Sequence, residues 1–395
     1  MSRRDAIDIA IVGAGVVGAA AALALARDGW QVALVEAREP ARWRAEAPDL
    51  RVYAFAPDNA ALLADLGVWD GIAAARAQPY RRMRVWDAAG GDELRFDADA
   101  FGRRELGWIV ENGLLVDRLW QALSGAGVRL SCPAQLATLE QDGAHATLEL
   151  DDSTRLRARL VLAADGGESK LRSLAGIETY THDYTQSGLV AFVDHAASHE
   201  ATCWQRFLPT GPLAFLPFAG EDGHRSSIVW TLPEAEALRL LQVDDAAFLR
   251  ELDAAFAGTL GALRAVSKRA AFPLRRQLAQ QYVAGRVAVI GDAAHVVHPL
   301  AGQGVNLGLR DVGALRAALR RQRGAGRDPG AATALARWAR ERRSENAVAA
   351  YSFDGLNKLF SNDAVLASLA RGPLLGLVGK FPPLRHAFWR HAAGL

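Results

Sequence analysis

Apolar and polar positions at the start of the chain predict a strand, a helix and a second strand. Ile7–Val12 is a short apolar run, Val16–Asp28 is apolar at helical spacing, and Gln31–Glu36 is again short and apolar. Gly29 ends the helical stretch, where glycine often closes a helix. A βαβ opening of this kind is typical of a parallel sheet covered by helices.

The later pattern divides into two textures. Helices are predicted over Asn59–Leu66 and Leu115–Leu123, a hairpin over Leu136–Glu140 and Ala146–Leu150, and a strand over Arg159–Ala164. From about Tyr180, short β-rich runs broken by Pro and Gly predict an antiparallel sheet at Gly188–Asp194, Cys203–Leu208, Pro212–Phe218 and Ser226–Leu232. A helix over Asp244–Phe256 follows. The strand Arg286–Ile290 and a helix over Gly304–Arg321 return to the first texture, and a polar linker follows at Arg323–Gly330.

The spacing of Gly13, Gly15 and Gly18 between strand and helix predicts a dinucleotide site. The first glycine permits a tight turn, the second lets a pyrophosphate approach the backbone, and the third lets the helix pack on the strand. Glu36 ends the second strand, where a carboxylate can bind ribose hydroxyls and repels a 2′-phosphate. These residues alone do not separate FAD from NAD.

A second strand, turn and helix carries further chemistry. Val287–Ile290 leads into Gly291 and Asp292, and a Gly-rich turn then opens the helix at Gly304. An acid at a strand end can bind sugar hydroxyls, and backbone N–H groups at a helix start favour an anionic or electron-rich ligand. Two such turns far apart in the sequence predict one long ligand that is held at both ends.

Composition narrows the class of protein. The chain has 395 residues, 50% of them hydrophobic, and a net charge of +2, which predicts two structural domains and does not indicate nucleic acid. The two cysteines, Cys132 and Cys203, form no CxxC motif, so no disulfide scaffold and no metal site are expected. The apolar span Ile9–Ala26 is similar to a signal peptide, but its glycines and the nearby Asp5 and Asp8 argue for a cytoplasmic protein.

A third segment, Asp165-Gly166-Gly167-Glu168-Ser169 with Arg172, also follows a strand. Together with the two glycine turns it resembles the FAD-dependent single-component aromatic hydroxylases, which have the fold of para-hydroxybenzoate hydroxylase. In that family the middle motif usually reads Asp-Gly-Ala-Asn-Ser, so Gly167 and Glu168 depart from it.

The resemblance implies FAD as the cofactor and gives each motif a role. Gly13, Gly15, Gly18 and Glu36 hold the ADP part, and Arg51 reaches the phosphates or the adenosine. Asp165 belongs to the middle loop, which contacts the flavin and NAD(P)H. Asp292, after Gly291, binds the ribityl chain, and Gly302, Gln303, Gly304 and Asn306 lie near the pyrimidine edge of the flavin.

More specific motifs resemble the ubiquinone-biosynthesis flavin hydroxylases over nearly the whole chain. They are Tyr184-Thr185-Gln186, Arg206-Phe207-Leu208-Pro209, Val229-Trp230-Thr231-Leu232-Pro233, Phe272-Pro273-Leu274, the run from His298 to Gly304, and Asp354–Asn362. This family implies hydroxylation of a polyprenyl phenol or benzoquinol. NAD(P)H reduces the flavin, O₂ adds to it, and a C4a-hydroperoxide delivers one oxygen to the ring.

The resulting fold prediction is an α/β protein. It has a Rossmann-type FAD-binding domain, an inserted antiparallel β-sheet for the substrate, and C-terminal helices. The FAD-binding domain is expected over residues 1–75, 111–178 and 276–350. The substrate domain is expected over 76–110 and 179–275, and a helical, basic and apolar tail over 351–395.

The catalytic and substrate-facing residues are less defined by sequence. No side chain is an obvious general base, and His298 and Pro299 are the candidates to approach the substrate, whereas His295 is expected to pack beside the turn. Phe215, Phe218 and Trp230 lie on the predicted substrate sheet, and sequence leaves open whether they face the substrate or pack in a core.

The C-terminal tail has a composition that can bind a membrane surface. After Asp363 the chain has no acid, and Arg371, Lys380, Arg385 and Arg390 alternate with apolar residues. Such a tail can bind an anionic inner-membrane surface or pack on the domain. Two other functions stay open: a flavin hydroxylase of a small soluble aromatic, and a non-catalytic FAD-binding subunit of a ubiquinone-biosynthesis complex. The ring position, the choice of NADH or NADPH and the oligomeric state are not specified by the sequence.

Overall fold

The apolar run Ile7–Val12 forms β1 inside a parallel sheet of the first domain. This computed structural model describes residues 7–220, 222–298 and 304–360. The sheet has the order β18 (Val283–Ala284), β19 (Val287–Val289), β11 (Arg155–Ala163), β1, β2 (Val32–Val35) and β8 (Arg129–Ser131). β19, β11, β1, β2 and β8 are mutually parallel. The hairpin β9 (Leu136–Gln141) and β10 (Ala146–Leu150) extends β11 with antiparallel pairing.

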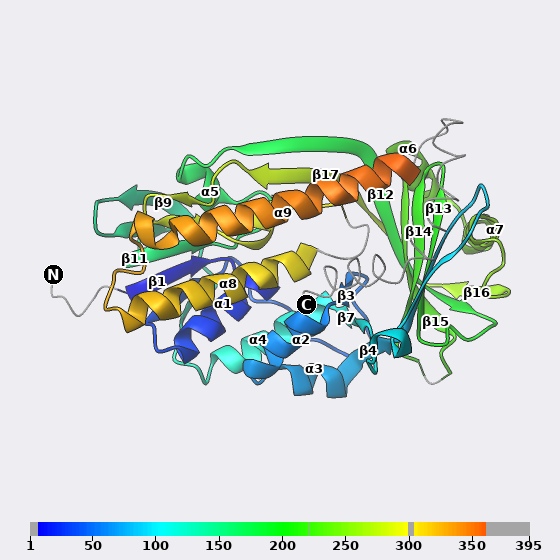
Figure 1. Ribbon diagram of the computed structural model, residues 1–395, viewed down its shortest axis with the longest axis horizontal. Helices are drawn as coiled ribbons and strands as arrows, with labels where there is room; N and C mark the ends of the chain where they lie inside the picture. The colour runs from blue at the N-terminus through cyan, green and yellow to red at the C-terminus, as the bar shows by residue number, and fades with distance from the viewer. Residues whose placement is uncertain (1–6, 221, 299–303, 361–395) are drawn as a thin grey trace.

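Helices cover this sheet as its buried apolar strands require. α1 (Val16–Arg27) buries a continuous alanine and leucine surface and contacts both α4 (Asn112–Leu123) and α8 (Gly304–Gly324). The expected βαβ unit is present, and Gly29, with φ of 82°, lies just after the α1 C-cap residue Asp28. α9 (Ala332–Phe360) then runs beside α8 toward the second domain (Figure 1). No helix in the described part of the chain is long and apolar enough to cross a bilayer.

The second domain is a large, mainly antiparallel sheet. Its order is β20 (His295–Val296), β17 (Ala270–Ala279), β12 (Thr179–His195), β15 (Arg225–Pro233), β14 (Gly211–Pro217), β13 (Thr202–Leu208), β5 (Arg82–Asp87) and β6 (Leu94–Asp97), with β16 (Leu263–Val266) on β12. The predicted fold class is confirmed, with the difference that β13 and β5 pair in parallel. The long ribbon of β12 and β17 joins the two domains, and β20 comes from the Gly-Asp segment (Figure 1).

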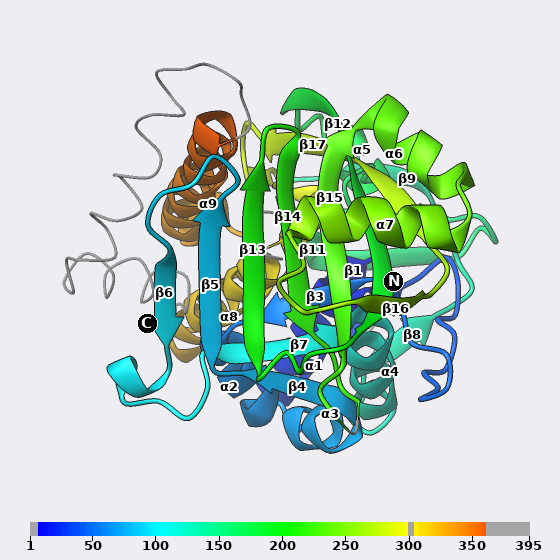
Figure 2. The same cartoon turned by 90° about the vertical axis from the view of Figure 1, so that its right-hand side faces the viewer.

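The outer face of this sheet is covered by α6 (Glu234–Gln242) and α7 (Asp245–Phe256), as Figure 2 shows. α7 begins where Asp244 accepts a hydrogen bond from the Ala247 N–H at 2.7 Å, which caps the helix. Strand alternation sends Leu213, Phe215, Ile228 and Trp230 into the core under these helices. The opposite, inner face is turned toward the first domain.

A small third sheet lies at the inner face. It consists of β3 (Val52–Phe55), β7 (Gly107–Glu111) and β4 (Ala77–Tyr80), and the helices α2 (Pro57–Asp65) and α3 (Trp69–Arg76) connect β3 to β4. Ala54 and Ile109 of this sheet share a buried cluster with Phe192, Cys203 and Phe218 of the large sheet. This apolar contact holds the small sheet against the large sheet.

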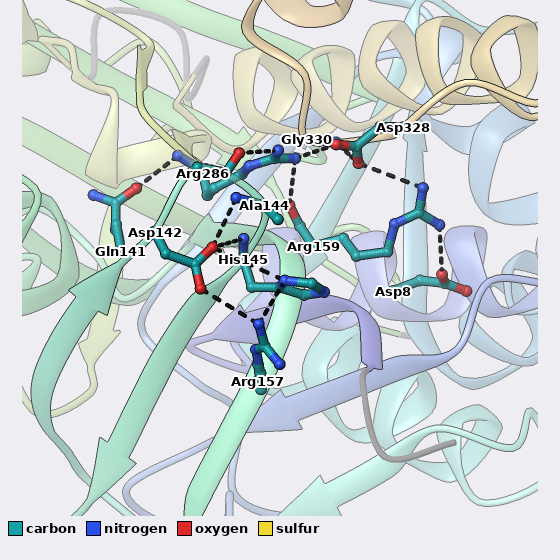
Figure 3. Close-up of polar contacts among 11 residues, drawn as sticks. Asp8, Gln141, Asp142, Ala144, His145, Arg157, Arg159, Arg286, Asp328 and Gly330 are labelled. Atoms are coloured by element: carbon teal, nitrogen blue, oxygen red, sulfur yellow. Dashed lines mark hydrogen bonds and ion pairs between the residues drawn. The ribbon is translucent and has the colours of Figure 1, made fainter. Parts of the chain in front are cut away.

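The linker between α8 and α9 covers residues 325–331, so Arg323 and Gly324, predicted as linker, belong to α8. Ion pairs hold the end of the linker in place (Figure 3). Asp328 accepts hydrogen bonds from the Arg286 guanidinium and from the Gly330 N–H, the latter at 3.1 Å. Arg159 pairs with both Asp328, at 3.5 Å, and Asp8, at 3.2 Å. These contacts tie the connection between α8 and α9 to β11 and to the residue before β19.

Candidate functional site

A cavity of about 490 Å³ opens at the carboxyl ends of the parallel strands. In open α/β sheets this edge is where ligands bind. The first glycine turn, Asp292, the start of α8, the middle loop and β3 reach the cavity. Its wall includes Gly13, Gly15, Val17, Glu36, Arg51, Tyr53, Asn112, Gln135, Asp165, Gly166, Lys170, Asp292, Gly304 and Val305.

The first glycine turn has no room for side chains on its protein side. A Cβ on Gly18 would lie 1.9 Å from the Gly13 carbonyl oxygen, and Gly13 has φ of 97°. Gly15 is different, because a Cβ there would meet no atom of the described residues within 4 Å. Gly13 and Gly18 are therefore needed for the fold itself, whereas Gly15 leaves open space on the cavity wall.

Glu36 lies beside this turn. Its carboxylate accepts a hydrogen bond from the Ala14 N–H at 2.6 Å and one from the Arg38 N–H at 3.2 Å. The indole N–H of Trp120, on α4, donates a hydrogen bond to the Ala14 carbonyl at 2.8 Å. Trp120 was not among the residues predicted for the site. The turn is thus fixed from two sides, and the Glu36 carboxylate is placed where β2 ends at the cavity.

Asp292 is exposed to the cavity although protein surrounds it on the other sides. Desolvation by that surrounding raises the pKa of the Asp292 carboxyl, and the nearby His295, Arg51 and Arg275 oppose the rise. Arg51 lines the same wall, and its guanidinium lies 5.8 Å from the ring centre of Phe272 on β17. The structure therefore brings Asp292 and Arg51, far apart in sequence, to one cavity.

The middle loop links the cavity to both domains. Asp165 accepts hydrogen bonds from the Ser169 hydroxyl and, at 3.1 Å, from the Leu171 N–H, which form the start of α5 (Lys170–Leu174). Arg172 donates to the Ala293 carbonyl at 3.0 Å and so connects this loop to the Gly-Asp segment. Burial lowers the pKa of the Arg172 guanidinium, and the neighbouring Asp165 opposes this effect.

The two departures from the family motif have a structural explanation. Glu168 forms an ion pair with Arg275 of β17. A Cβ on Gly167 would lie 3.1 Å from the same Arg275 guanidinium, and the Gln277 amide donates to the Gly167 carbonyl at 2.8 Å. Gly167 leaves room for the arginine and Glu168 supplies its counter-charge, so both residues fit the ribbon that passes over this loop.

Asn306 lies at the predicted segment but its side chain is used within the protein. Its amide oxygen accepts from the Ala56 N–H at 3.0 Å and from the Asn59 amide at 2.9 Å, and its amide nitrogen donates to the Ala54 carbonyl at 2.8 Å. The side chain is fully buried between β3, α2 and α8. The Asn306 side chain thus joins the start of α8 to β3 and α2, and the placement of Asn306 near the flavin edge stays a prediction.

A buried polar network behind Asp292 was missed by sequence reasoning. Asp311 of α8 accepts from the Gly291 N–H at 3.0 Å, from Arg342 at 2.8 Å and from Asn346 at 3.0 Å, and it lies 2.6 Å from His295. Although burial opposes ionisation, His295 and Arg342 lower the pKa of the Asp311 carboxyl. The sequence carried one sign of this network: Asp311 occupies a position on the side of the predicted helix Gly304–Arg321 that is otherwise apolar.

His298 is buried, and among residues 7–220, 222–298 and 304–360 neither of its ring nitrogens has a hydrogen-bond partner. Burial lowers the pKa of His298 to about 4, so the imidazole is neutral at physiological pH. Its ring meets the edge of Tyr184 at a centroid distance of 5.0 Å. Pro299, Gly302 and Gln303 lie outside the described residues, as does the tail from residue 361.

The three aromatic candidates of the substrate sheet do not reach the cavity. Phe215 is fully buried and stacks on Phe256 of α7 at 3.9 Å, and Trp230 packs beside Phe248. Phe218 is buried on the inner side against Phe192, at 4.3 Å. Of the two alternatives that the sequence left open, the packing role holds for all three, because α6, α7 and β3 cover them.

Comparison with known proteins agrees with this geometry. The family described as FAD binding domain matches residues 6–345. The chain is 38% identical over 388 residues to ubiquinone hydroxylase UbiL of Rhodospirillum rubrum, covering 98% of this chain and 89% of that protein. It is 37% identical over 390 residues to 3-demethoxyubiquinol 3-hydroxylase of Escherichia coli, covering 98% of both chains.

Solved structures show the same fold. p-Nitrophenol 4-monooxygenase PnpA of Pseudomonas putida aligns with a TM-score of 0.78 at 19% identity, over 97% of this chain and 96% of that chain. HpxO of Klebsiella pneumoniae, solved with FAD, aligns with a TM-score of 0.76 at 19% identity, over 98% and 99% of the two chains. The cofactor of this protein is FAD. The chain belongs to the FAD-dependent aromatic-ring monooxygenases, within the group that contains the ubiquinone-biosynthesis hydroxylases.

Proposed function

We propose that this protein hydroxylates the aromatic ring of a polyprenyl phenol or benzoquinol intermediate of ubiquinone biosynthesis, with NAD(P)H and O₂ as co-substrates. The similarity to two ubiquinone-pathway hydroxylases over 98% of the chain carries the proposal. The cavity supports it, because the first glycine turn, the start of α8 and the two charged residues Arg51 and Asp292 meet there.

The donor set of the cavity fits FAD. The start of α1 lines the cavity at Gly15, Val16 and Val17, where backbone N–H groups would bind the pyrophosphate, and Gly15 would leave it room. Glu36 takes the adenosine ribose, and Arg51 the phosphates or the adenosine. Asp292 binds the ribityl hydroxyls; the raised pKa of its carboxyl suits a group that hydrogen-bonds neutral hydroxyls. Asp165 holds the loop beside them.

When bound, FAD supplies the activation of O₂ and the transfer of one oxygen atom to the ring. The chain itself must bind and orient the ring and exclude water. The start of α8, at Gly304, offers backbone N–H groups that stabilise negative charge at the cavity. Gly302 and Gln303 are proposed to share this role on the preceding turn.

His298, together with Pro299, remains the proposed contact to the substrate hydroxyl. A neutral imidazole can donate one hydrogen bond and accept another, and no residue in the described part of the chain bonds either ring nitrogen of His298. His298→Gln keeps a donor and an acceptor, whereas His298→Leu removes both. The KM for the phenol should rise in His298→Leu and stay closer to wild type in His298→Gln. Equal values in both variants would remove His298 from the site.

The basic tail is proposed to bind an anionic membrane surface, where a polyprenyl substrate is dissolved. Arg371, Lys380, Arg385 and Arg390 carry its charge. Replacing all four by glutamine should reduce co-sedimentation with vesicles that contain phosphatidylglycerol, because each cation contributes about 1 kcal/mol at such a surface. Vesicles of phosphatidylcholine alone are the control, and unchanged binding to anionic vesicles would contradict the proposal.

Complementation tests the function as a whole. The gene is expressed in bacterial strains that each lack one ubiquinone hydroxylation step, and accumulated intermediates are identified by mass. The strain that is rescued identifies the ring position that this protein hydroxylates. The Asp292→Ala variant should not rescue that strain. A protein that binds FAD, rescues no strain and oxidises NAD(P)H only with small soluble phenols would instead support the catabolic alternative. FAD binding without any turnover would support the non-catalytic subunit.

A further inference from the structure

One row of side chains crosses the inner face of the large sheet and is partly exposed. Strand register places Val190 opposite Val229, Val229 opposite Ala214, and Ala214 opposite Gln205. All four side chains are partly exposed. We name Val190, Val229, Ala214 and Gln205 the inner row.

The rows on either side of it are mostly covered. Toward β3 and β7, the next residues along these strands are Phe192, Ser227, Leu216 and Cys203, and three of these share a buried cluster with Ala54 and Ile109 of the first domain. On the other side, Gly188, Thr231, Pro212 and Phe207 are buried. The inner row is therefore a partly open strip between two covered rows, on the face turned toward the FAD-binding domain.

The strip adjoins the cavity wall. Phe272 of β17 pairs in register with Gly188 and lies under the Arg51 guanidinium, 5.8 Å away. Phe272 is 43% exposed, which is unusual for a phenylalanine on a sheet face that packs on another domain. Three strand spacings separate Val190 from Gln205, about 14 Å. That length accommodates a substituted aromatic ring and the first carbons of its side chain.

Chemistry changes along the strip. Val190, Val229 and Ala214 present small apolar groups, and Gln205 ends the row with an amide. No hydrogen bond of the Gln205 side chain is seen within the described residues. A partly buried amide without a protein partner is costly unless it remains hydrated or meets a ligand. An apolar floor that ends in one donor and acceptor group matches an aromatic ring that carries an oxygen substituent.

We propose that the inner row is the surface on which the substrate ring lies, with Gln205 hydrogen-bonded to a ring hydroxyl or methoxyl oxygen. This inference rests on the proposed function and names the specificity-determining residues of the same site. Ala214 and Val229 have small side chains, so they leave more space above the sheet than larger residues would. A larger side chain at either position fills that space.

The test uses two pairs of variants in the full-length FAD-loaded protein. Ala214→Phe fills the strip, and Ala235→Phe adds the same bulk on the exposed surface of α6. Gln205→Leu removes the amide, and Gln31→Leu does so at an exposed position of the first domain. The readouts are the Kd of a short-chain prenyl phenol, followed by its effect on the flavin absorption spectrum, the KM, the FAD content and the Tm.

Ala214→Phe should weaken phenol binding by more than about tenfold, since overpacking leaves no space for the ring. Gln205→Leu should weaken it by about three- to tenfold, the effect of one lost hydrogen bond. FAD content and both control variants should match wild type. If wild type binds and hydroxylates the phenol and both Gln205→Leu and Ala214→Phe do so equally well, the inner row is not the site. If wild type neither binds nor hydroxylates any prenyl phenol, the proposed function fails instead.

Discussion

The imidazole of His295 lies 2.6 Å from the carboxylate of Asp311, and both side chains are fully buried. The same carboxylate accepts the Gly291 N–H at 3.0 Å. Asp311 therefore holds the turn that presents Asp292 to the cavity, although Asp311 itself is not among the residues of the cavity wall.

The Asp311→Asn variant should be destabilised by about 3–5 kcal/mol, because Arg342 and His295 lose their buried partner. Chemical denaturation gives this value directly. The FAD dissociation constant should rise as well, since the turn at Gly291 is no longer fixed. Asp70→Asn, at an exposed position of α3, is the matched control. Wild-type stability in Asp311→Asn would mean that the network does not support the turn.

Gly15→Ala should leave folding intact and weaken FAD binding. A Cβ at Gly15 meets no protein atom within 4 Å, and the residue has φ of −65°, which alanine adopts freely. Only a ligand that approaches the backbone would be affected, by an expected tenfold or more, about 1.4 kcal/mol. FAD titration of the apoprotein measures this, and Gly125→Ala, also in open space, should bind FAD as wild type does.

Asp292→Ala should lose FAD on gel filtration, whereas Asp292→Asn should keep part of it. The carboxyl of Asp292 faces the cavity, where it is proposed to accept hydrogen bonds from the ribityl hydroxyls. Asparagine preserves an acceptor at that position and alanine does not. Retention of stoichiometric FAD by Asp292→Ala, with wild-type affinity, would contradict the assignment to the ribityl chain.

Phe215→Ala should destabilise the protein by about 3–5 kcal/mol and leave the KM for the phenol unchanged. Phe215 stacks on Phe256 in the core between the sheet and α7. The measurement pairs a denaturation curve with steady-state kinetics at a temperature where the variant stays folded. A large rise in KM without loss of stability would return Phe215 to the substrate side.

The free energy of unfolding should fall when the pH drops below about 6.5, which is the ordinary pKa of a histidine side chain. Burial lowers the pKa of both His195 and His199 in the folded protein, so the unfolded chain binds protons that the folded chain does not. The lost stability grows by up to about 1.4 kcal/mol per pH unit for each histidine, until the folded pKa is reached. Melting curves at pH 7.5 and 5.5 measure the effect, and His199→Gln should reduce it.

The local elements were largely predictable because each has a complete signal in its own sequence. The helix at Val16 and the strand before it carry their glycine turn with them, and the hairpin at Leu136 carries its polar turn. The motif positions Glu36, Arg51 and Asp292 could be predicted through the family resemblance, and the structure brings all three to one cavity.

The roles of the other side chains depend on which face of a helix or strand is covered by the rest of the protein. The spacing of apolar residues along the chain does not identify that face. Phe215 and Leu216 alternate in β14, and only the position of α7 decides that Phe215 enters the core while Leu216 faces the first domain. Asn306 likewise has the right spacing for a ligand contact, yet β3 and α2 use its amide. Long-range packing decided both cases.

The hydrogen bonds of Asn306 also affect the order in which the two domains can fold during translation. The Ala54 carbonyl and the Ala56 N–H are hydrogen-bonded to the Asn306 side chain, which lies about 250 residues further along the chain. By the time that partner leaves the ribosome, the strands from Thr179 to Ala279 are already complete and can pair with one another. The substrate sheet can therefore assemble first during translation, and the cofactor-binding domain closes around its own N-terminal segment only at the end.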